Sequence, residues 1–154
     1  MNKFNWPLIN DNITEEDKKV LVDFIMTPGV RFTQHKNVRK FEKKWSEWLG
    51  VNHTVFVNSG ASANYIMMSV VRDLFDGGEV IVPPLGWVSD IAPVVNLGLE
   101  PVFVDINMSN LSLDIDKVEA AITEKTRAIV LVHALGFNGV SHRLLELCQK
   151  NNIV

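Results

Sequence analysis

After Gly50, short runs rich in β-branched residues alternate with segments that carry apolar residues at helical spacing. Strands are predicted over 53–57, 79–82, 101–105 and 127–132, and another is predicted to begin at 153–154. Helices are predicted between them, over 61–75, 88–97, 113–122 and 140–150. Strands that alternate with helices form βαβ units, which give a mostly parallel sheet covered on both faces. The fold class is therefore α/β, with three αβα layers.

The residues before this alternation follow a different pattern. Residues 1–13 show no regular period and are typical of an irregular arm. Thr14 and Asp17 resemble a capping box and predict a helix that runs to about Met26. A second amphipathic helix is predicted over 36–49. We therefore expect two parts, an N-terminal arm with two helices over 1–50 and an incomplete α/β domain over 51–154.

Composition excludes several classes of protein. The chain has 154 residues, of which 47% are hydrophobic and 21% charged, so it can bury a core and is not disordered. A net charge of −3 gives no general attraction for nucleic acid or for an anionic membrane. A single cysteine, Cys148, excludes an internal disulfide. Because no signal peptide or membrane span is recognisable, a cytoplasmic location is expected, and no metal site is predicted.

The strand–helix junction from Val55 to Met68 is a candidate anion site. Six small residues, 58–63, separate the predicted strand from the helix. Free N–H groups at a helix start favour an anion, most often a phosphate, and small side chains let the backbone approach it. The junction has neither the GxGxxG nor the Walker A pattern. Close packing, or a simple helix cap at Asn58 or Ser59, explains the same residues, so both interpretations stay open at this point.

Two further loops are expected near this junction. Ligands of parallel α/β sheets bind beyond the carboxyl ends of the strands. The loops at that edge are 58–62, 83–89 and 133–138. Any chemistry of the chain is therefore sought among these three loops.

Taken in order, the chain's segments resemble the sugar aminotransferases of the DegT/DnrJ/EryC1/StrS family, which are pyridoxal-phosphate enzymes of fold type I. The matching segments are FTQHKNVRKFEKKWSEWLG, VNSGASAN, GGEVIVPPLGWVSD, GLEPVFVDI, DIDKVEAAITEKTRAIVLVHALG and LLELCQKNNIV, which cover most of the chain. This sequence departs from the family pattern at His35, where the family often has Gly, and at Ala61, where it often has Thr. The resemblance implies the N-terminal part of the fold type I large domain, with pyridoxal 5'-phosphate as cofactor.

The resemblance also implies roles for individual residues. The backbone of Gly60, Ala61 and Ser62, with the Ser62 hydroxyl, would hold the cofactor phosphate. Trp87 matches the aromatic residue that stacks on the pyridine ring, and core packing is the alternative for it. His133 matches a family histidine, and a packed, hydrogen-bonded histidine explains it equally well.

The family's carboxylate that pairs with the pyridine nitrogen, and its catalytic lysine, are expected beyond Val154, so the chain is expected to be inactive alone. The resemblance implies a fragment of an aminotransferase that acts on a nucleotide-linked keto-sugar in polysaccharide or deoxyaminosugar biosynthesis. Glutamate would be the amino donor and a homodimer the assembly. One alternative is a nucleotide-linked 4-keto-6-deoxyhexose 3-dehydrase. This subgroup has histidine in place of the lysine, and the segments SGASAN and RFTQ…EKKWSEWLG look closer to it. Another is a non-catalytic α/β interaction module.

Overall fold

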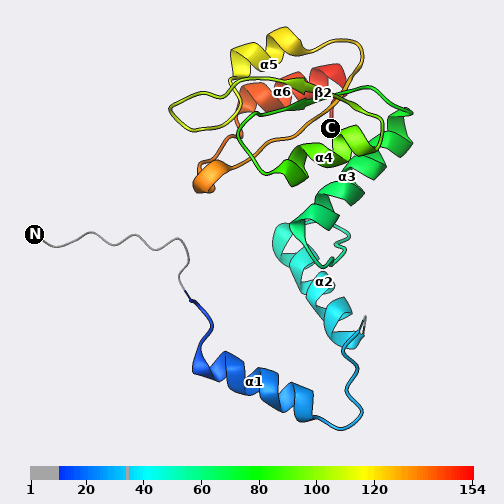
Figure 1. Cartoon of the computed structure of the whole chain (residues 1–154), viewed down its shortest axis with the longest axis vertical. Coiled ribbons are helices and arrows are strands. Elements are labelled where there is room, and N and C mark those ends of the chain that lie inside the picture. Colours follow the sequence, from blue (N-terminus) through cyan, green and yellow to red (C-terminus); the bar gives the residue numbers. More distant parts are fainter. Residues whose placement is uncertain (1–10, 34) are drawn as a thin grey trace, which may run out of the picture. The chain divides into compact units, whose positions relative to one another are not determined.

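A computed structural model describes residues 11–33 and 35–154 of the chain. The described residues fall into two units, one that ends at Phe56 and one that covers 57–154 (Figure 1). Most of the predicted irregular arm, 1–13, lies outside the described residues. Among the described residues, no helix combines the length and the apolar character needed to cross a bilayer.

In the first unit, helix α1 (Glu15–Met26) begins where the sequence predicts it. Thr14 Oγ1 accepts a hydrogen bond from Asp17 N at 3.1 Å, and the Asp17 carboxylate accepts one from Thr14 N at 2.8 Å. These reciprocal bonds make a capping box. The backbone N–H and then the hydroxyl of Thr14 lower the pKa of the Asp17 carboxyl. The start of α1 is therefore set by residues that are close together in the sequence.

Helix α2 (Lys36–Leu49) ends at Gly50, whose φ of 76° lies in the left-handed region that favours glycine. The strand predicted over 53–57 is wrong, because these residues pair with no strand in the described structure. Phe56 N instead donates to Glu42 Oε1 at 3.0 Å, and the Phe56 ring meets Phe41 edge-on. A strand needs a neighbouring strand to satisfy its N–H and C=O groups, so an apolar pattern alone does not create one.

The second unit is built on a three-stranded sheet. Its strands are β1 (Glu79–Val82), β2 (Glu100–Phe103) and β3 (Thr126–Ile129), in the order β2-β1-β3 with both pairings parallel. On the outer side of β3, Val154 N donates to Arg127 O at 2.9 Å and Ile129 N donates to Val154 O at 2.9 Å. Residues 153–154 therefore continue the sheet beside β3, where the sequence predicts a strand.

Helices cover both faces of the sheet, as Figure 1 shows. They are α3 (Gly60–Phe75) and α4 (Val88–Asn96) on one face, and α5 (Ile115–Ala121) and α6 (His142–Asn151) on the other. Successive strand residues point to opposite faces. Val80 and Val82 therefore join the core beneath α3 and α4, while Ile81 joins the core beneath α5 and α6. The predicted αβα layers are confirmed.

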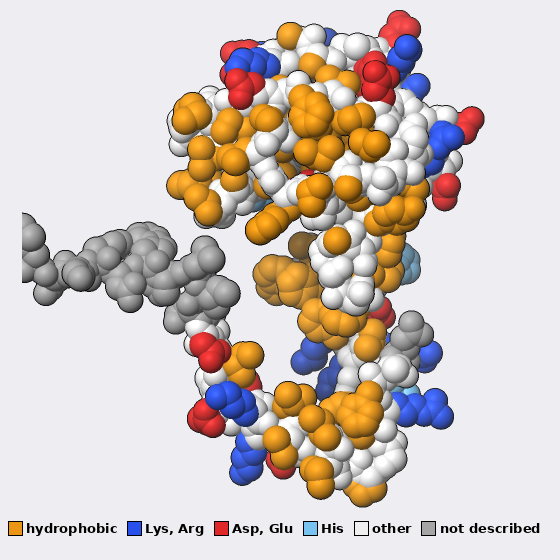
Figure 2. Space-filling model, in the orientation of Figure 1, with side chains coloured by type: hydrophobic (Ala, Val, Ile, Leu, Met, Phe, Trp, Pro, Cys, Tyr) orange, Lys and Arg blue, Asp and Glu red, His pale blue; other side chains and the backbone are white. Residues whose placement is uncertain are grey.

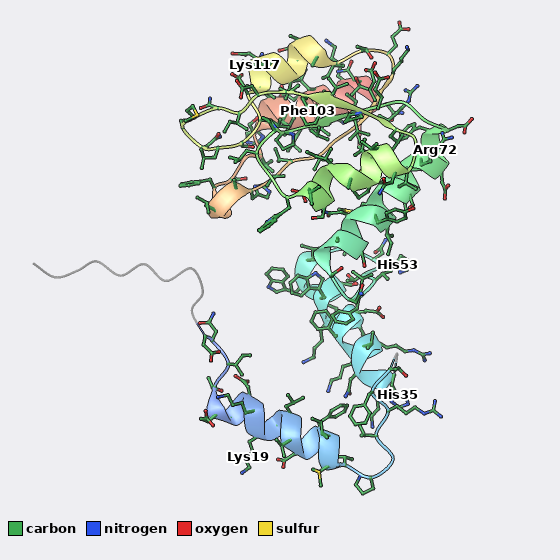
Figure 3. The ribbon with its side chains drawn as sticks, viewed as in Figure 1. Lys19, His35, His53, Arg72, Phe103 and Lys117 are labelled. Carbon is green, nitrogen blue, oxygen red and sulfur yellow. The ribbon has the colours of Figure 1, made fainter. Side chains whose placement is uncertain are left out.

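Strands β2 and β3 are shorter than the predicted segments 101–105 and 127–132. The central strand β1 limits them, because it ends before Pro83. Beyond β2, Asp105 forms an ion pair with Lys117 Nζ of α5 at 3.0 Å; Figure 3 labels Lys117 and also Phe103, the last residue of β2. This bond from Lys117 is the main cause that lowers the pKa of the Asp105 carboxyl.

Candidate functional site

In the part of the chain that the structure describes, the start of helix α3 carries backbone donors without partners. Ser59 is the N-cap, and its Oγ accepts a hydrogen bond from Ser62 N at 3.2 Å. The Ser62 hydroxyl donates to Asn58 Oδ1 at 2.6 Å. Within the described structure, the N–H groups of Gly60 and Ala61 have no acceptor. Ser59 is thus a cap, as one interpretation of the sequence held, and two donors at the positive end of the helix dipole stay available for an anion.

Nothing in the described structure requires a glycine at position 60. Among the described residues, no heavy atom would lie within 4 Å of a Cβ atom added there. Its φ is not among the positive values of the chain, so the backbone conformation suits any residue. A ligand that comes close to the backbone would need this open space.

The loop that follows β1 presents Trp87 to solvent. Trp87 is the N-cap of α4 and is 79% exposed, so the core-packing alternative is not what the described structure contains. Its backbone N donates to Asp90 Oδ2 at 2.9 Å, and Asp90 N donates to Trp87 O at 2.9 Å. A Cβ on Gly86 would lie 2.8 Å from Asp90 Oδ2, which explains the glycine there. The loop therefore fixes the backbone of Trp87 and leaves its indole free.

The loop that follows β3 holds His133 through one backbone hydrogen bond. Gly139 N donates to His133 Nδ1 at 3.2 Å. Because Nδ1 accepts, the proton of the uncharged ring is assigned to Nε2, which is then a donor. A side chain at position 139 would collide with Ser112, since a Cβ there would lie 1.9 Å from its Oγ. The close approach that only glycine allows thus brings the backbone donor to His133.

One cavity of about 790 Å³ connects these loops. Its polar lining includes Asn64, Asp90 and His133, with Trp87 at the same wall, and apolar residues of α3 and of 128–132 form most of the remainder. Figure 2 shows hydrophobic side chains, in orange, gathered over the unit 57–154. Residues 60–62 do not line the cavity. Trp87 and His133 therefore line the same cavity. Asn64, which also lines it, lies one helical turn after the start of α3 at Gly60.

Asn64 and Asp90 are site residues to which the sequence assigned no role. Asn64 Nδ2 donates to Asp90 Oδ1 at 2.9 Å and to the backbone oxygen of Ser89 at 3.2 Å. The sequence holds one signal for this contact. Pro93 follows Ser89 by four residues and has no N–H to donate to its carbonyl, so another donor is needed there.

Residues 11–154 match the sequence model of the DegT/DnrJ/EryC1/StrS aminotransferase family. The chain belongs to this family. It is 36% identical over 137 residues to the GDP-4-keto-6-deoxy-D-mannose 3-dehydratase of Yersinia pseudotuberculosis, covering 86% of this chain and 34% of that protein. It is 29% identical over 147 residues to the GDP-perosamine synthase of Vibrio cholerae, covering 96% and 40% respectively.

Solved structures give the same result. The E. coli GDP-4-keto-6-deoxy-D-mannose-3-dehydratase with bound hydrated PLP superimposes with a TM-score of 0.84 at 27% identity. The match covers 97% of this chain and 39% of that one. The chain therefore spans between a third and two fifths of the length of these relatives. The resemblance to the family, and with it the fold type, is confirmed.

Proposed function

We propose that residues 57–154 anchor pyridoxal 5'-phosphate in an enzyme of this family that acts on a nucleotide-linked keto-sugar. Membership of the family supports the proposal, as does the PLP named in the E. coli relative. The observation that carries it is the open space over Gly60, where two backbone donors have no acceptor within the described structure. The start of a helix with free N–H groups is an anion-binding site that suits a phosphate.

Each residue of the site would then have a distinct task. The N–H groups of Gly60 and Ala61 would bind the phosphate of the cofactor, and the Ser62 hydroxyl would turn to it from Asn58 Oδ1. The exposed indole of Trp87 would cover one face of the pyridine ring. His133 would donate a hydrogen bond from Nε2. The bound cofactor supplies an electron sink for chemistry on the substrate, which side chains alone do not provide.

We further propose that the reactive amine of the enzyme is not supplied by these 154 residues. In support, no lysine lines the cavity in the described part of the chain. Borohydride reduction of the chain with pyridoxal 5'-phosphate, followed by peptide mass mapping, tests this proposal. We expect no single lysine to be labelled selectively. One lysine labelled stoichiometrically would contradict the proposal.

Two reactions remain candidates for the enzyme as a whole. Transamination, with glutamate as the amino donor, is the activity for which the family is named. Dehydration at C3 is favoured by the 36% identity to a 3-dehydratase. In either case we propose residues 51–154 as an incomplete cofactor domain, residues 1–50 as its arm and two helices, and a homodimer as the assembly. Light scattering of the purified chain measures the last of these.

The variant Gly60→Ala tests the cofactor site directly. Alanine fits the space and the backbone conformation, so the free energy of unfolding should stay the same or rise by about 0.4–1 kcal/mol. The added methyl group would stand between the backbone donors and a phosphate. We therefore expect the affinity for pyridoxal 5'-phosphate, measured by equilibrium dialysis, to fall about tenfold or more, the equivalent of about 1.4 kcal/mol.

Ala120→Val is a matched control, because Ala120 is exposed on α5, on the other face of the sheet. It should leave the affinity unchanged. Pyridoxal, which lacks the phosphate, should bind the wild-type chain much more weakly than the phosphorylated cofactor. Equal binding of both compounds, or an unchanged affinity in Gly60→Ala, would contradict the phosphate site. An oligomeric chain that binds neither compound would favour the interaction module instead.

A further inference from the structure

We propose that Asn64 and Asp90 are positioning residues that fix Trp87 relative to the phosphate-binding start of α3. This inference rests on the proposed cofactor site. It adds the two residues that set the distance between the phosphate site and Trp87. We call the two side chains and their hydrogen bonds the Asn64–Asp90 clamp. They lie on different helices, α3 and α4, and both are half-buried in the wall of the cavity.

The clamp begins where helix α4 lacks one backbone hydrogen bond. In an α-helix the N–H of residue 93 would donate to the carbonyl of Ser89, but Pro93 has no N–H. The side-chain amide of Asn64 donates to that carbonyl at 3.2 Å. A backbone acceptor that the helix cannot satisfy is thus satisfied from the neighbouring helix. This bond ties the first turn of α4 to the first turns of α3.

The carboxylate of Asp90 transmits the connection to Trp87. One of its oxygens accepts from Asn64 Nδ2 at 2.9 Å, and the other accepts from Trp87 N at 2.9 Å. Both carboxylate oxygens therefore have a donor, and the Asp90 side chain links Asn64 to the backbone of Trp87. The absence of a side chain at Gly86 leaves room for the carboxylate.

Trp87 depends on this connection because its own side chain is exposed. A buried aromatic ring is oriented by the atoms packed around it, whereas the Trp87 indole is 79% exposed. In the ligand-free chain, Asp90 holds the backbone of Trp87 and so fixes the point from which the indole extends. Asn64 lies one turn after the Gly60 and Ala61 donors on the same helix. The clamp therefore sets the distance between the phosphate site and the aromatic surface, which a ligand with both a phosphate and a ring requires.

The clamp is tested with chain labelled with 5-fluorotryptophan, in which Trp87→Phe assigns the fluorine signal of Trp87. In the ligand-free protein, Asn64→Ala should shift or broaden this signal, because Asp90 loses one of its two donors. The same variant should bind pyridoxal 5'-phosphate about fivefold to tenfold more weakly, the size of effect expected for the loss of one hydrogen bond of ordinary net strength. Its affinity for inorganic phosphate should change by less than about twofold, because the donors at Gly60 and Ala61 stay in place.

Two further variants separate positioning from a general loss of structure. Asn64→Asp places two carboxylates together, and its effects should exceed those of Asn64→Ala. Asn64→Asp combined with Asp90→Asn exchanges the donor and the acceptor, so a hydrogen bond between the two side chains can form again. The double variant should recover part of the wild-type fluorine signal and affinity, because the bond between the two side chains returns while the bond to the Ser89 carbonyl does not. Asn96→Ala, at the far end of α4, is the matched control and should behave as wild type.

The outcomes distinguish this inference from the proposed function. A wild-type chain that does not bind pyridoxal 5'-phosphate would overturn the proposed function, and the role of the clamp toward a ligand with it. If the wild-type chain binds, but Asn64→Ala matches Asn96→Ala in both fluorine signal and affinity, the inference alone is overturned. A double variant that is no better than Asn64→Asp in a folded protein also overturns it. Recovery in the double variant, together with unchanged phosphate affinity in Asn64→Ala, supports it.

Discussion

The two units of this chain bury their side chains to very different extents. Every buried hydrophobic side chain in the described structure belongs to 57–154, whereas Ser46 is the only buried residue of the described part of 1–56. Both units contain amphipathic helices with well-formed caps. The comparison shows that local sequence signals suffice to set where a helix begins and ends, while a cooperative core needs elements that are distant in sequence.

The largest expected difference between the units concerns the loss of apolar side chains. Ile81 in β1 is fully buried, so Ile81→Ala should lower the free energy of unfolding by about 2–5 kcal/mol. Leu21 in α1 is 57% exposed, and Leu21→Ala should change it by less than about 0.5 kcal/mol. Urea unfolding followed by circular dichroism measures both. Similar losses in the two variants would contradict the comparison.

A smaller difference is expected at the helix caps. Ser141 Oγ accepts a hydrogen bond from Leu144 N at the start of α6, and Thr14 makes the equivalent bond in α1. Ser141→Ala should cost the 57–154 unit about 1 kcal/mol in global stability, because α6 packs on the core. Thr14→Ala should speed amide exchange in α1 only. Exchange that accelerates in both units in the same variant would show that they unfold together.

The capping box of α1 also predicts a pH dependence. The folded-state pKa of Asp17 is lowered by the Thr14 backbone N–H and hydroxyl. The stabilisation of α1 is therefore complete above the ordinary aspartate pKa of about 3.9, and is lost as the pH falls through the lower folded value. Amide chemical shifts of Thr14 against pH should give a midpoint below the ordinary one. Thr14→Ala keeps the backbone N–H and loses the hydroxyl, so the Asp17 midpoint should move only part of the way back to the ordinary value. An unshifted midpoint in the wild-type chain would contradict the capping box.

The smallest effect is expected at Cys148, which packs against the core beneath α5 and α6. Burial raises the pKa of its thiol. In the folded chain the thiol should therefore stay protonated to higher pH, and stability should fall slightly as the pH rises past about 8.5, where the unfolded thiol ionises first. Iodoacetamide should react with the folded chain at pH 8 more slowly than with the urea-unfolded chain. Equal rates would show that the thiol is freely accessible.

Sequence patterns predicted local features well and long-range contacts poorly. The bounds of α2 and β1 agree with the prediction, since a helix stop at Gly50 and a proline after β1 are local signals. The strand over 53–57 failed because strand formation depends on a partner elsewhere in the chain. The parallel-sheet rule placed Trp87 and His133 at a common edge of the sheet. The bond between Asn64 and Asp90, 26 residues apart, was missed because it too depends on a partner elsewhere in the chain.

The edge of the sheet at β2 has a consequence for how the protein behaves at high concentration. Glu100 N donates to Gly78 O, next to β1, and Val104 N donates to Val82 O of β1. By alternation, the backbone nitrogens of residues 101 and 103 point outward. The first of these belongs to Pro101, which has no hydrogen to offer. A strand from another molecule that approached this edge would find one of its donors missing. The sheet is therefore a poor template for edge-to-edge aggregation on its β2 side.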